Sequence, residues 1–77
     1  MSEKTLFDLP CGEKAIIKKL CNPTDMRRRL FDLGFAPESP VSCVFKAPMG
    51  DPKAFVIKGT VIALREEDSS LILLKTP

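Results

Sequence analysis

The sequence predicts a small, mostly β protein in which one helix covers the end of a barrel of about five strands. Only the segment from Asn22 to Phe35 has both the apolar spacing and the end signals of a full helix. The rest of the chain divides into short segments rich in β-branched residues, separated by turns that contain proline or glycine. So many strands in 77 residues would leave open sheet edges, and curling into a barrel removes them.

Length and charge limit the function classes. The chain predicts one domain, residues 1–77, near the size at which a single core only just offsets chain entropy. Twelve basic and ten acidic residues give a net charge of +2, too balanced to indicate nucleic acid or an anionic membrane. No apolar run approaches the roughly 20 residues of a membrane helix, and the N-terminus lacks a signal peptide's apolar centre. We expect a soluble, cytoplasmic protein without direct membrane insertion.

The first elements are a turn, a strand and the helix. Thr5 to Gly12 predicts a lead-in turn that buries two or three side chains, and Ala15 to Leu20 predicts a strand whose lysines face water. Asn22 is the expected helix cap, followed by Pro23 at the first helical position and by Asp25 as the acid of a capping box. The expected buried stripe and the stop signal are Met26, Leu30, Leu33 and then Gly34.

Two strands joined by a loop are predicted after the helix. Val41 to Lys46 alternates apolar and polar residues, with Val44 as the exception, which is typical of a half-buried strand. Ala47 to Pro52 contains turn residues, and Lys53 to Lys58 predicts the returning strand of a hairpin.

The last two strands follow short turns. Gly59 and Thr60 predict a tight turn into the strand Val61 to Arg65. Glu66 to Ser70 predicts a polar turn, with a single 3₁₀ turn as an alternative, and the apolar run in Leu71 to Lys75 predicts a strand buried on both faces. We place five aromatic residues in the core or at the barrel end: Phe7, Phe31, Phe35, Phe45 and Phe55.

The run Arg27, Arg28 and Arg29 leaves two interpretations open. The helical period turns these side chains about 100° apart, so they cannot share one face. In one interpretation they lie on a solvated face and pair at four-residue spacing, Asp25 with Arg29 and Arg28 with Asp32. In the other they form a docking surface for an acidic patch or a phosphate, because the guanidinium group makes directional hydrogen bonds.

Other positions also bear on contacts. Asp32 lies in the last helical turn, where an acid opposes the helix dipole, so we expect it to bond Arg28, Arg65 or a backbone amide. The loop Ala47 to Pro52 is either a plain hairpin turn or a contact site, since Met49 at its tip is flexible and apolar. The residues predicted to contact a partner are Arg27, Arg28, Met49 and Asp51.

The sequence predicts no catalytic, cofactor or metal site. Cys11, Cys21 and Cys43 are an odd number without paired spacing, and histidine is absent from the sequence, so neither a disulfide framework nor a zinc site is indicated. The carboxylates are scattered, and the sequence contains no glycine-rich phosphate loop. Because the sequence has no histidine, it also lacks the commonest general base of enzymes. We therefore expect a protein that is not an enzyme.

Short motifs run along nearly the whole chain. They are Leu6, Leu9 and Gly12, then Arg29-Leu30 with Asp32-Leu33-Gly34, then Ala47-Pro48 with Gly50-Asp51-Pro52, then Gly59, and finally Ala63-Leu64-Arg65. Their order and spacing resemble the FeoA family of small cytosolic proteins associated with bacterial ferrous iron uptake. Two turn residues depart from the family pattern, Glu38 where Gly is usual and Ser69 where Ala is usual.

The resemblance implies an SH3-like β-barrel with a helix inserted after the first strand. It also implies an accessory or regulatory role in which the protein docks on the cytosolic GTP-binding domain of the ferrous iron transporter, and is recruited to the inner face of the membrane by that partner. The residues that would form the structural signature are Arg29, Leu30, Asp32, Leu33, Gly34, Pro48, Gly50, Pro52, Gly59 and Arg65.

Alternatives to this reading stay open. An SH3-like barrel could bind nucleic acid through Arg27 to Arg29 and the lysines, although the missing Tyr and Trp remove the usual stacking platforms. Metal-dependent repressors carry a similar interaction domain, but this chain has no helix-turn-helix, so we expect a free-standing protein. Self-association through exposed strand edges also stays open.

Overall fold

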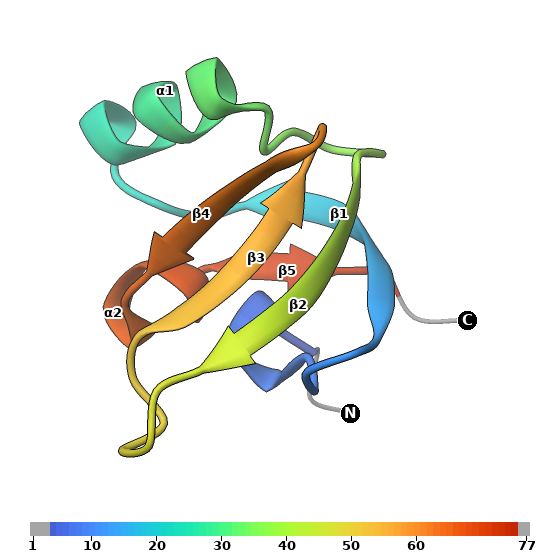
Figure 1. The fold of residues 1–77 in the computed structure, drawn as a ribbon. Coiled ribbons are helices and arrows are strands. Elements are labelled where there is room, and N and C mark those ends of the chain that lie inside the picture. Colours follow the sequence, from blue (N-terminus) through green and yellow to red (C-terminus); the bar gives the residue numbers. More distant parts are fainter. Residues whose placement is uncertain (1–3, 76–77) are drawn as a thin grey trace.

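The computed structural model describes residues 4–75 and shows one antiparallel sheet with a main helix at one end (Figure 1). In chain order the elements are the 3₁₀ turn η1 (Leu6–Asp8), β1 (Lys14–Leu20), α1 (Thr24–Leu33), β2 (Pro40–Lys46), β3 (Lys53–Ile57), β4 (Thr60–Leu64), α2 (Glu66–Ser69) and β5 (Ile72–Leu74). The predicted mostly β fold, with one main helix after the first strand, is confirmed.

The sheet is curled (Figure 1), and its two edge strands, β4 and β5, are the last two strands in the sequence. The strand order is β4-β3-β2-β1-β5, and each neighbouring pair is antiparallel. Between residues 4 and 75 no ladder joins β4 to β5, and α2 connects these strands along the chain, so the barrel is not fully closed. None of the helices in that range is long and apolar enough to span a bilayer.

The start of α1 differs from the prediction. Pro23 is the N-cap residue, and no side chain caps the helix. Asn22 instead turns away from the helix, where its side chain is buried and donates a hydrogen bond from Nδ2 to the Asp68 carbonyl at 3.0 Å. The predicted Asn22 cap is therefore wrong, because the side-chain amide ties the approach to α1 to the distant helix α2.

The end of α1 agrees with the prediction. Gly34 has φ +107°, and its amide donates to the Phe31 carbonyl, while the Phe35 amide donates to the Leu30 carbonyl at 2.9 Å. These two bonds form a Schellman motif, in which a left-handed residue ends the helix and a pair of apolar side chains closes it. Leu30 and Phe35 are that pair, and both are fully buried. The motif thus directs the chain from the helix into the core.

Gly34→Ala is expected to destabilise the protein by about 1–2 kcal/mol, because an L side chain is strained at this φ. An added Cβ would also lie 3.1 Å from Cδ of Lys58, although that flexible side chain can move aside. Urea unfolding measures the change. Gly34→Asn carries the same Cβ but tolerates positive φ better, so its loss should be smaller. An alanine variant as stable as the parent would contradict this account.

The turn between β3 and β4 lies one residue earlier than predicted. Lys58 and Gly59 both have positive φ, +49° and +79°, and Ile57 pairs with Thr60 across the turn. Two central residues with positive φ form the type I′ turn that matches the twist of a hairpin. Gly59 therefore takes the second turn position, and Thr60 already belongs to β4.

The last strand also differs from the prediction. Ile72 and Leu74 are buried, whereas Leu71 is exposed and Leu73 is half-buried. The expectation of burial on both faces is wrong because β5 is an edge strand that pairs with β1 alone among the strands. Its outer edge meets the N-terminal segment, where Leu74 donates its amide to the Lys4 carbonyl at 2.9 Å. The polar segment before β5, predicted as a turn, forms the short helix α2.

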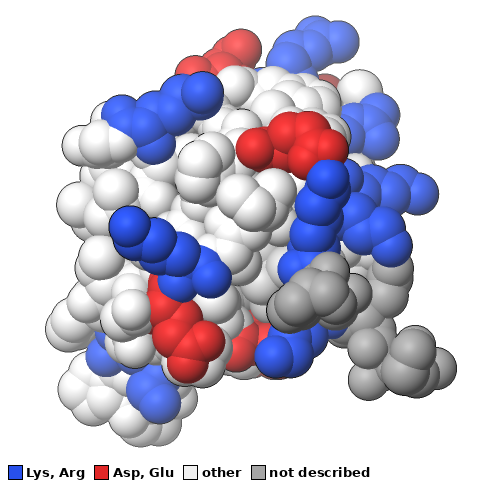
Figure 2. Space-filling view, turned by 90° about the vertical axis from the view of Figure 1, so that its right-hand side faces the viewer, with Lys and Arg blue, Asp and Glu red and all other residues white. Residues whose placement is uncertain are grey.

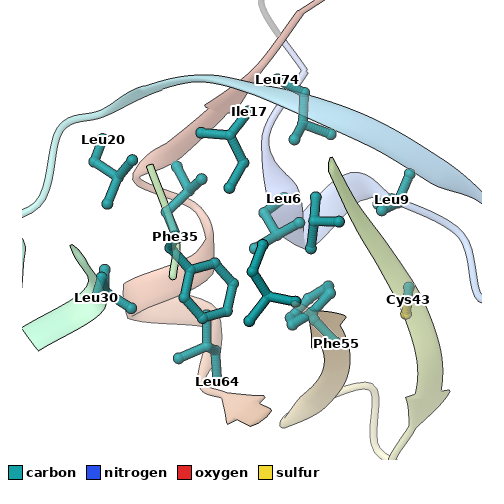
Figure 3. Packing of buried hydrophobic residues seen from close by; sticks show 13 residues of the cluster. Leu6, Leu9, Ile17, Leu20, Leu30, Phe35, Cys43, Phe55, Leu64 and Leu74 are labelled. Atoms are coloured by element: carbon teal, nitrogen blue, oxygen red, sulfur yellow. The ribbon is translucent and has the colours of Figure 1, made fainter. Parts of the chain in front are cut away.

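The core draws side chains from η1, from α1 and from all five strands (Figure 3). Its members are Leu6, Leu9, Ile17, Leu20, Leu30, Phe35, Val41, Cys43, Phe55, Ile57, Leu64, Ile72 and Leu74. Phe35 and Phe55 are fully buried, as predicted, and Phe7 is half-buried. Phe31 and Phe45 are 45% and 57% exposed, so neither is a core residue. Phe31 lies on α1 at one end of the barrel (Figure 1), the other place predicted for these residues.

A buried lysine fastens the N-terminal turn to the sheet. Lys53 begins β3 and is only 6% exposed. Its Nζ donates to the carbonyls of Phe7 at 2.7 Å and of Leu9 at 2.8 Å, and it lies 5.2 Å from the centre of the Phe7 ring. The ammonium group is therefore desolvated but well bonded, which is the condition under which a buried charge is tolerated.

Candidate docking site

Two of the predicted contact residues lie on α1 around a shallow hollow. Arg28 is exposed and Arg27 is half-buried, and with Thr24 and Phe31 they line this hollow. Phe31 is four residues after Arg27 and three after Arg28, so the helical period places the three side chains on one face. We call the residues that line the hollow, Thr24, Arg27, Arg28 and Phe31, the α1 patch.

The sequence analysis missed the aromatic member of this patch. The predicted stripe buried Met26, Leu30 and Leu33, but only Leu30 is fully buried, while Met26 is half-buried and Leu33 is 42% exposed. The helix thus rests on the barrel along a narrow line and leaves Phe31 outside. The i, i+4 spacing of Arg27 and Phe31 was the signal that could have identified this face.

The predicted ion pairs of the helix do not form. Among the described residues no ion pair joins Asp25 to Arg29 or Arg28 to Asp32, and these side chains are exposed. The Asp32 side chain also accepts no hydrogen bond and forms no ion pair within residues 4–75. The expectation that the Asp32 side chain bonds Arg28, Arg65 or a backbone amide is therefore wrong.

A second exposed surface is the hairpin formed by β2 and β3. Met49 at the tip of its loop is 92% exposed, and Val44 and Phe45 on β2 are 49% and 57% exposed. A bulge shifts the register between Cys43 and Phe45, which reverses the alternation of faces along β2. For this reason Phe45 does not follow Cys43 into the core. We call Val44, Phe45 and Met49 the hairpin patch.

Asp51, the fourth predicted contact residue, has a bond within the fold. Its Oδ1 accepts a hydrogen bond from the Glu66 amide at 2.9 Å, at the first residue of α2. This contact joins the hairpin loop to the start of that helix. Asp51 also lines a polar hollow together with Arg65, Glu66, Glu67 and Ser70.

The four predicted contact residues fall on surfaces at opposite ends of the sheet. Figure 1 shows α1 near the turn between β3 and β4, whereas the loop with Met49 and Asp51 lies at the other end of these strands. Gly34 at the end of α1 approaches Lys58 in that turn, which agrees with this placement. The α1 patch and the hairpin patch are therefore separate surfaces.

The predicted signature residues divide into two groups. Leu30 is a core residue, and Gly34, Gly50 and Gly59 all have positive φ. Arg29, Asp32, Leu33, Pro48, Pro52 and Arg65 are exposed. The Arg65 guanidinium lies 3.9 Å from the Glu67 carboxylate, in an exposed pair that contributes little to stability. A structural role is thus visible for the leucine and the glycines.

Charge is mixed over the surface. On the face shown in Figure 2, basic side chains are interspersed with acidic and uncharged ones. Glu38 forms a salt bridge with Lys75, and both side chains are partly exposed. No group of three or more His, Cys, Asp or Glu side chains that could hold a metal ion occurs between residues 4 and 75.

The family model and several solved structures identify the FeoA family. Residues 4–76 match the model of the FeoA domain. The solution structure of iron(II) transport protein A from Clostridium thermocellum is 32% identical over 94% of this chain, with a TM-score of 0.88, and the match spans only 44% of that protein. FeoA-like protein from Clostridium acetobutylicum is 26% identical over 97% of this chain and 88% of its own, with a TM-score of 0.83. Comparison with curated proteins finds no match.

One crystallised relative also carries a description of its fold. Stenotrophomonas maltophilia FeoA, complexed with zinc, is 28% identical over 94% of this chain and 89% of its own, with a TM-score of 0.84. It is described as an SH3 domain protein and a candidate ferrous iron transport activating factor. A manganese-dependent transcriptional repressor shares the fold at only 13% identity. The predicted SH3-like fold is confirmed.

Proposed function

The chain belongs to the FeoA family, and we propose that it is a non-catalytic accessory protein of bacterial ferrous iron uptake that docks on the cytosolic GTP-binding domain of the ferrous iron transporter. The observation that carries the docking proposal is the α1 patch. An exposed phenylalanine beside two arginines is the composition found at the centres of protein interfaces, where aromatic residues and arginine are enriched.

The chemistry of the α1 patch supports binding rather than catalysis. Its hollow is lined by two guanidinium groups, a hydroxyl and an aromatic ring. A guanidinium group carries N–H donors and no acceptor, so it does not act as a general base, whereas it binds carboxylates in a directional way. The partner surface should therefore present acidic side chains around an apolar pocket that accepts Phe31.

The hairpin patch is the competing contact surface. It carries Met49 and Phe45 but, unlike the α1 patch, it has no pair of arginines around its aromatic ring. Because the two patches lie at opposite ends of the sheet, their contributions to binding can be tested separately. We place the primary contact on α1, and matched variants of the two patches distinguish the alternatives.

Substitutions in the α1 patch are expected to weaken binding of the isolated transporter GTP-binding domain at least about fivefold. Arg28→Glu reverses a rim charge and Phe31→Ala removes the apolar anchor, and changes of this kind typically cost about 1–3 kcal/mol. Calorimetric titration measures the affinity, and titration of the labelled chain followed by NMR maps the contact. Raising the salt concentration should weaken the charged contact further.

Two matched variants on β2 serve as controls. Lys46→Glu makes the same kind of charge reversal and Phe45→Ala removes a ring that is even more exposed than Phe31, so both should change the affinity less than about threefold. If the β2 variants lose affinity and the α1 variants do not, the contact lies on the hairpin patch. If the parent chain does not bind the domain at low salt, the proposed partner is wrong.

A further inference from the structure

Two cysteine thiols meet at the edge of the core. Sγ of Cys11 lies 3.3 Å from Sγ of Cys43, although the residues are 32 positions apart in the sequence. Both thiols are free in the structure. Figure 3 shows Cys43 on β2, as one of the residues of the core cluster. A disulfide bond has an S–S length of about 2.05 Å, so the two sulfur atoms would have to approach each other by about 1.2 Å to form one.

The backbone holds these residues side by side. Gly12, next to Cys11, donates its amide to the Cys43 carbonyl at 2.7 Å, and Cys43 donates its amide to the Glu13 carbonyl at 3.2 Å. These bonds extend the pairing of β1 with β2 beyond its last ladder residues, Lys14 and Ser42. The proximity of the two thiols therefore follows from the sheet and not from the rotamer of one side chain.

The environments of the two thiols give them different roles. Cys11 is exposed, so a dissolved reagent can reach its sulfur, whereas Cys43 is fully buried. Burial raises the pKa of the Cys43 thiol and the hydrogen bond with Cys11 raises it further, while the Lys53 ammonium opposes these effects. Cys43 is therefore the less accessible thiol and the one expected to react second.

We infer that Cys11 and Cys43 form a redox modification site, in which a low-molecular-weight disulfide converts the two thiols into a reversible disulfide that fastens the N-terminal turn to β2. Nothing in this inference depends on the proposed docking. The third cysteine, Cys21, is exposed and is not hydrogen-bonded to either thiol of the pair, so it provides an internal comparison.

The reaction proceeds by two thiol–disulfide exchanges. The Cys11 thiolate attacks one sulfur of oxidised glutathione, which forms a mixed disulfide and releases one glutathione thiolate. Cys43 then loses its proton and attacks Sγ of Cys11, which forms the protein disulfide and releases the second glutathione. The two protein thiols together lose two electrons and two protons. One glutathione disulfide gains them and becomes two glutathione thiols.

The test uses the full chain carrying Cys21→Ser, equilibrated without oxygen in glutathione buffers of increasing oxidised fraction. We expect the intact mass to fall by the two hydrogens of a disulfide, and both cysteines to lose their reaction with maleimide after denaturation. If the disulfide stabilises the fold, it must also form more readily in the folded chain than in the unfolded chain, by the same free energy. The effective concentration of the two thiols should therefore be about 100-fold higher in the folded protein than in the protein unfolded by guanidinium. The thermal unfolding midpoint should rise on the order of 10 °C.

Cys11→Ser in the same background is the control, because it removes the exposed thiol and leaves the core intact. Its thermal midpoint should not respond to oxidised glutathione. The inference is overturned if both thiols of the Cys21→Ser protein remain open to maleimide at every ratio. It is equally overturned if only a mixed disulfide with glutathione accumulates, or if the effective concentration is the same in the folded and unfolded chains.

Discussion

Phe55→Ala is expected to lower the free energy of unfolding by about 3–5 kcal/mol, the largest effect of any single change considered for this protein. Phe55 lies in β3 with no exposed surface, among core residues from α1 and from several strands (Figure 3). Removing the ring takes away its burial and leaves a cavity that the surrounding sheet cannot close. Domains of this size have only about 5–15 kcal/mol of stability, so the variant should be close to unfolding.

Urea denaturation followed by circular dichroism measures the loss for Phe55→Ala. Phe45→Ala is the matched control, since Phe45 lies on the neighbouring strand β2, where it pairs with Ala54, and is 57% exposed. Its expected change is within about 0.5 kcal/mol, as for most surface substitutions. Similar losses of stability for the two variants would contradict the assignment of Phe55 to the core and of Phe45 to the surface.

Lys53→Met is expected to destabilise the protein by about 2–3 kcal/mol. The substitution keeps an apolar side chain of similar length but removes the ammonium group, which leaves the Phe7 and Leu9 carbonyls without their donor. Hydrogen bonds from a charged group contribute about 1.5–3 kcal/mol each, and the relief from burying a charge offsets part of that loss. The η1 turn should loosen first, because these two bonds fasten it to β3.

Lys46→Met provides the control for Lys53→Met. Lys46 pairs directly with Lys53 across the β2–β3 ladder but is exposed, so its substitution should change stability by less than about 0.5 kcal/mol. Hydrogen exchange adds a local readout, since the Asp8 and Leu9 amides bond within η1 and should lose protection only in Lys53→Met. Unchanged protection at both amides would refute the fastening role of the lysine.

Much of the fold was predictable because its signals are local. The end of α1 at Gly34, the hairpin turn containing Gly59 and the five strand segments each depend on the dihedral preferences of a few neighbouring residues. The choice of a barrel also followed from a general constraint, namely that short strands in a small chain must limit their exposed edges. The family motifs agreed with this fold, and the family comparison confirms it.

The candidate site was predictable only in part. Arg27, Arg28 and Met49 are on accessible surfaces, and the helical spacing could also have indicated Phe31. The exposure of Phe45 could not have been found in this way, because it depends on a bulge that appears only when β2 pairs with β3. The engagement of Asp51 by the Glu66 amide likewise depends on a contact between the hairpin loop and α2.

Local pattern was thus sufficient to predict the main helix, the five strand segments and a curled sheet, and the resemblance of the short motifs indicated the family. The tertiary structure alone decided the partners of its buried polar and thiol groups: Asn22 with Asp68, Lys53 with the carbonyls of the N-terminal turn, and Cys11 with Cys43. The physical reason is that local preferences act over a few bonds, whereas these pairs are separated by 32 to 46 positions and meet only when the sheet curls.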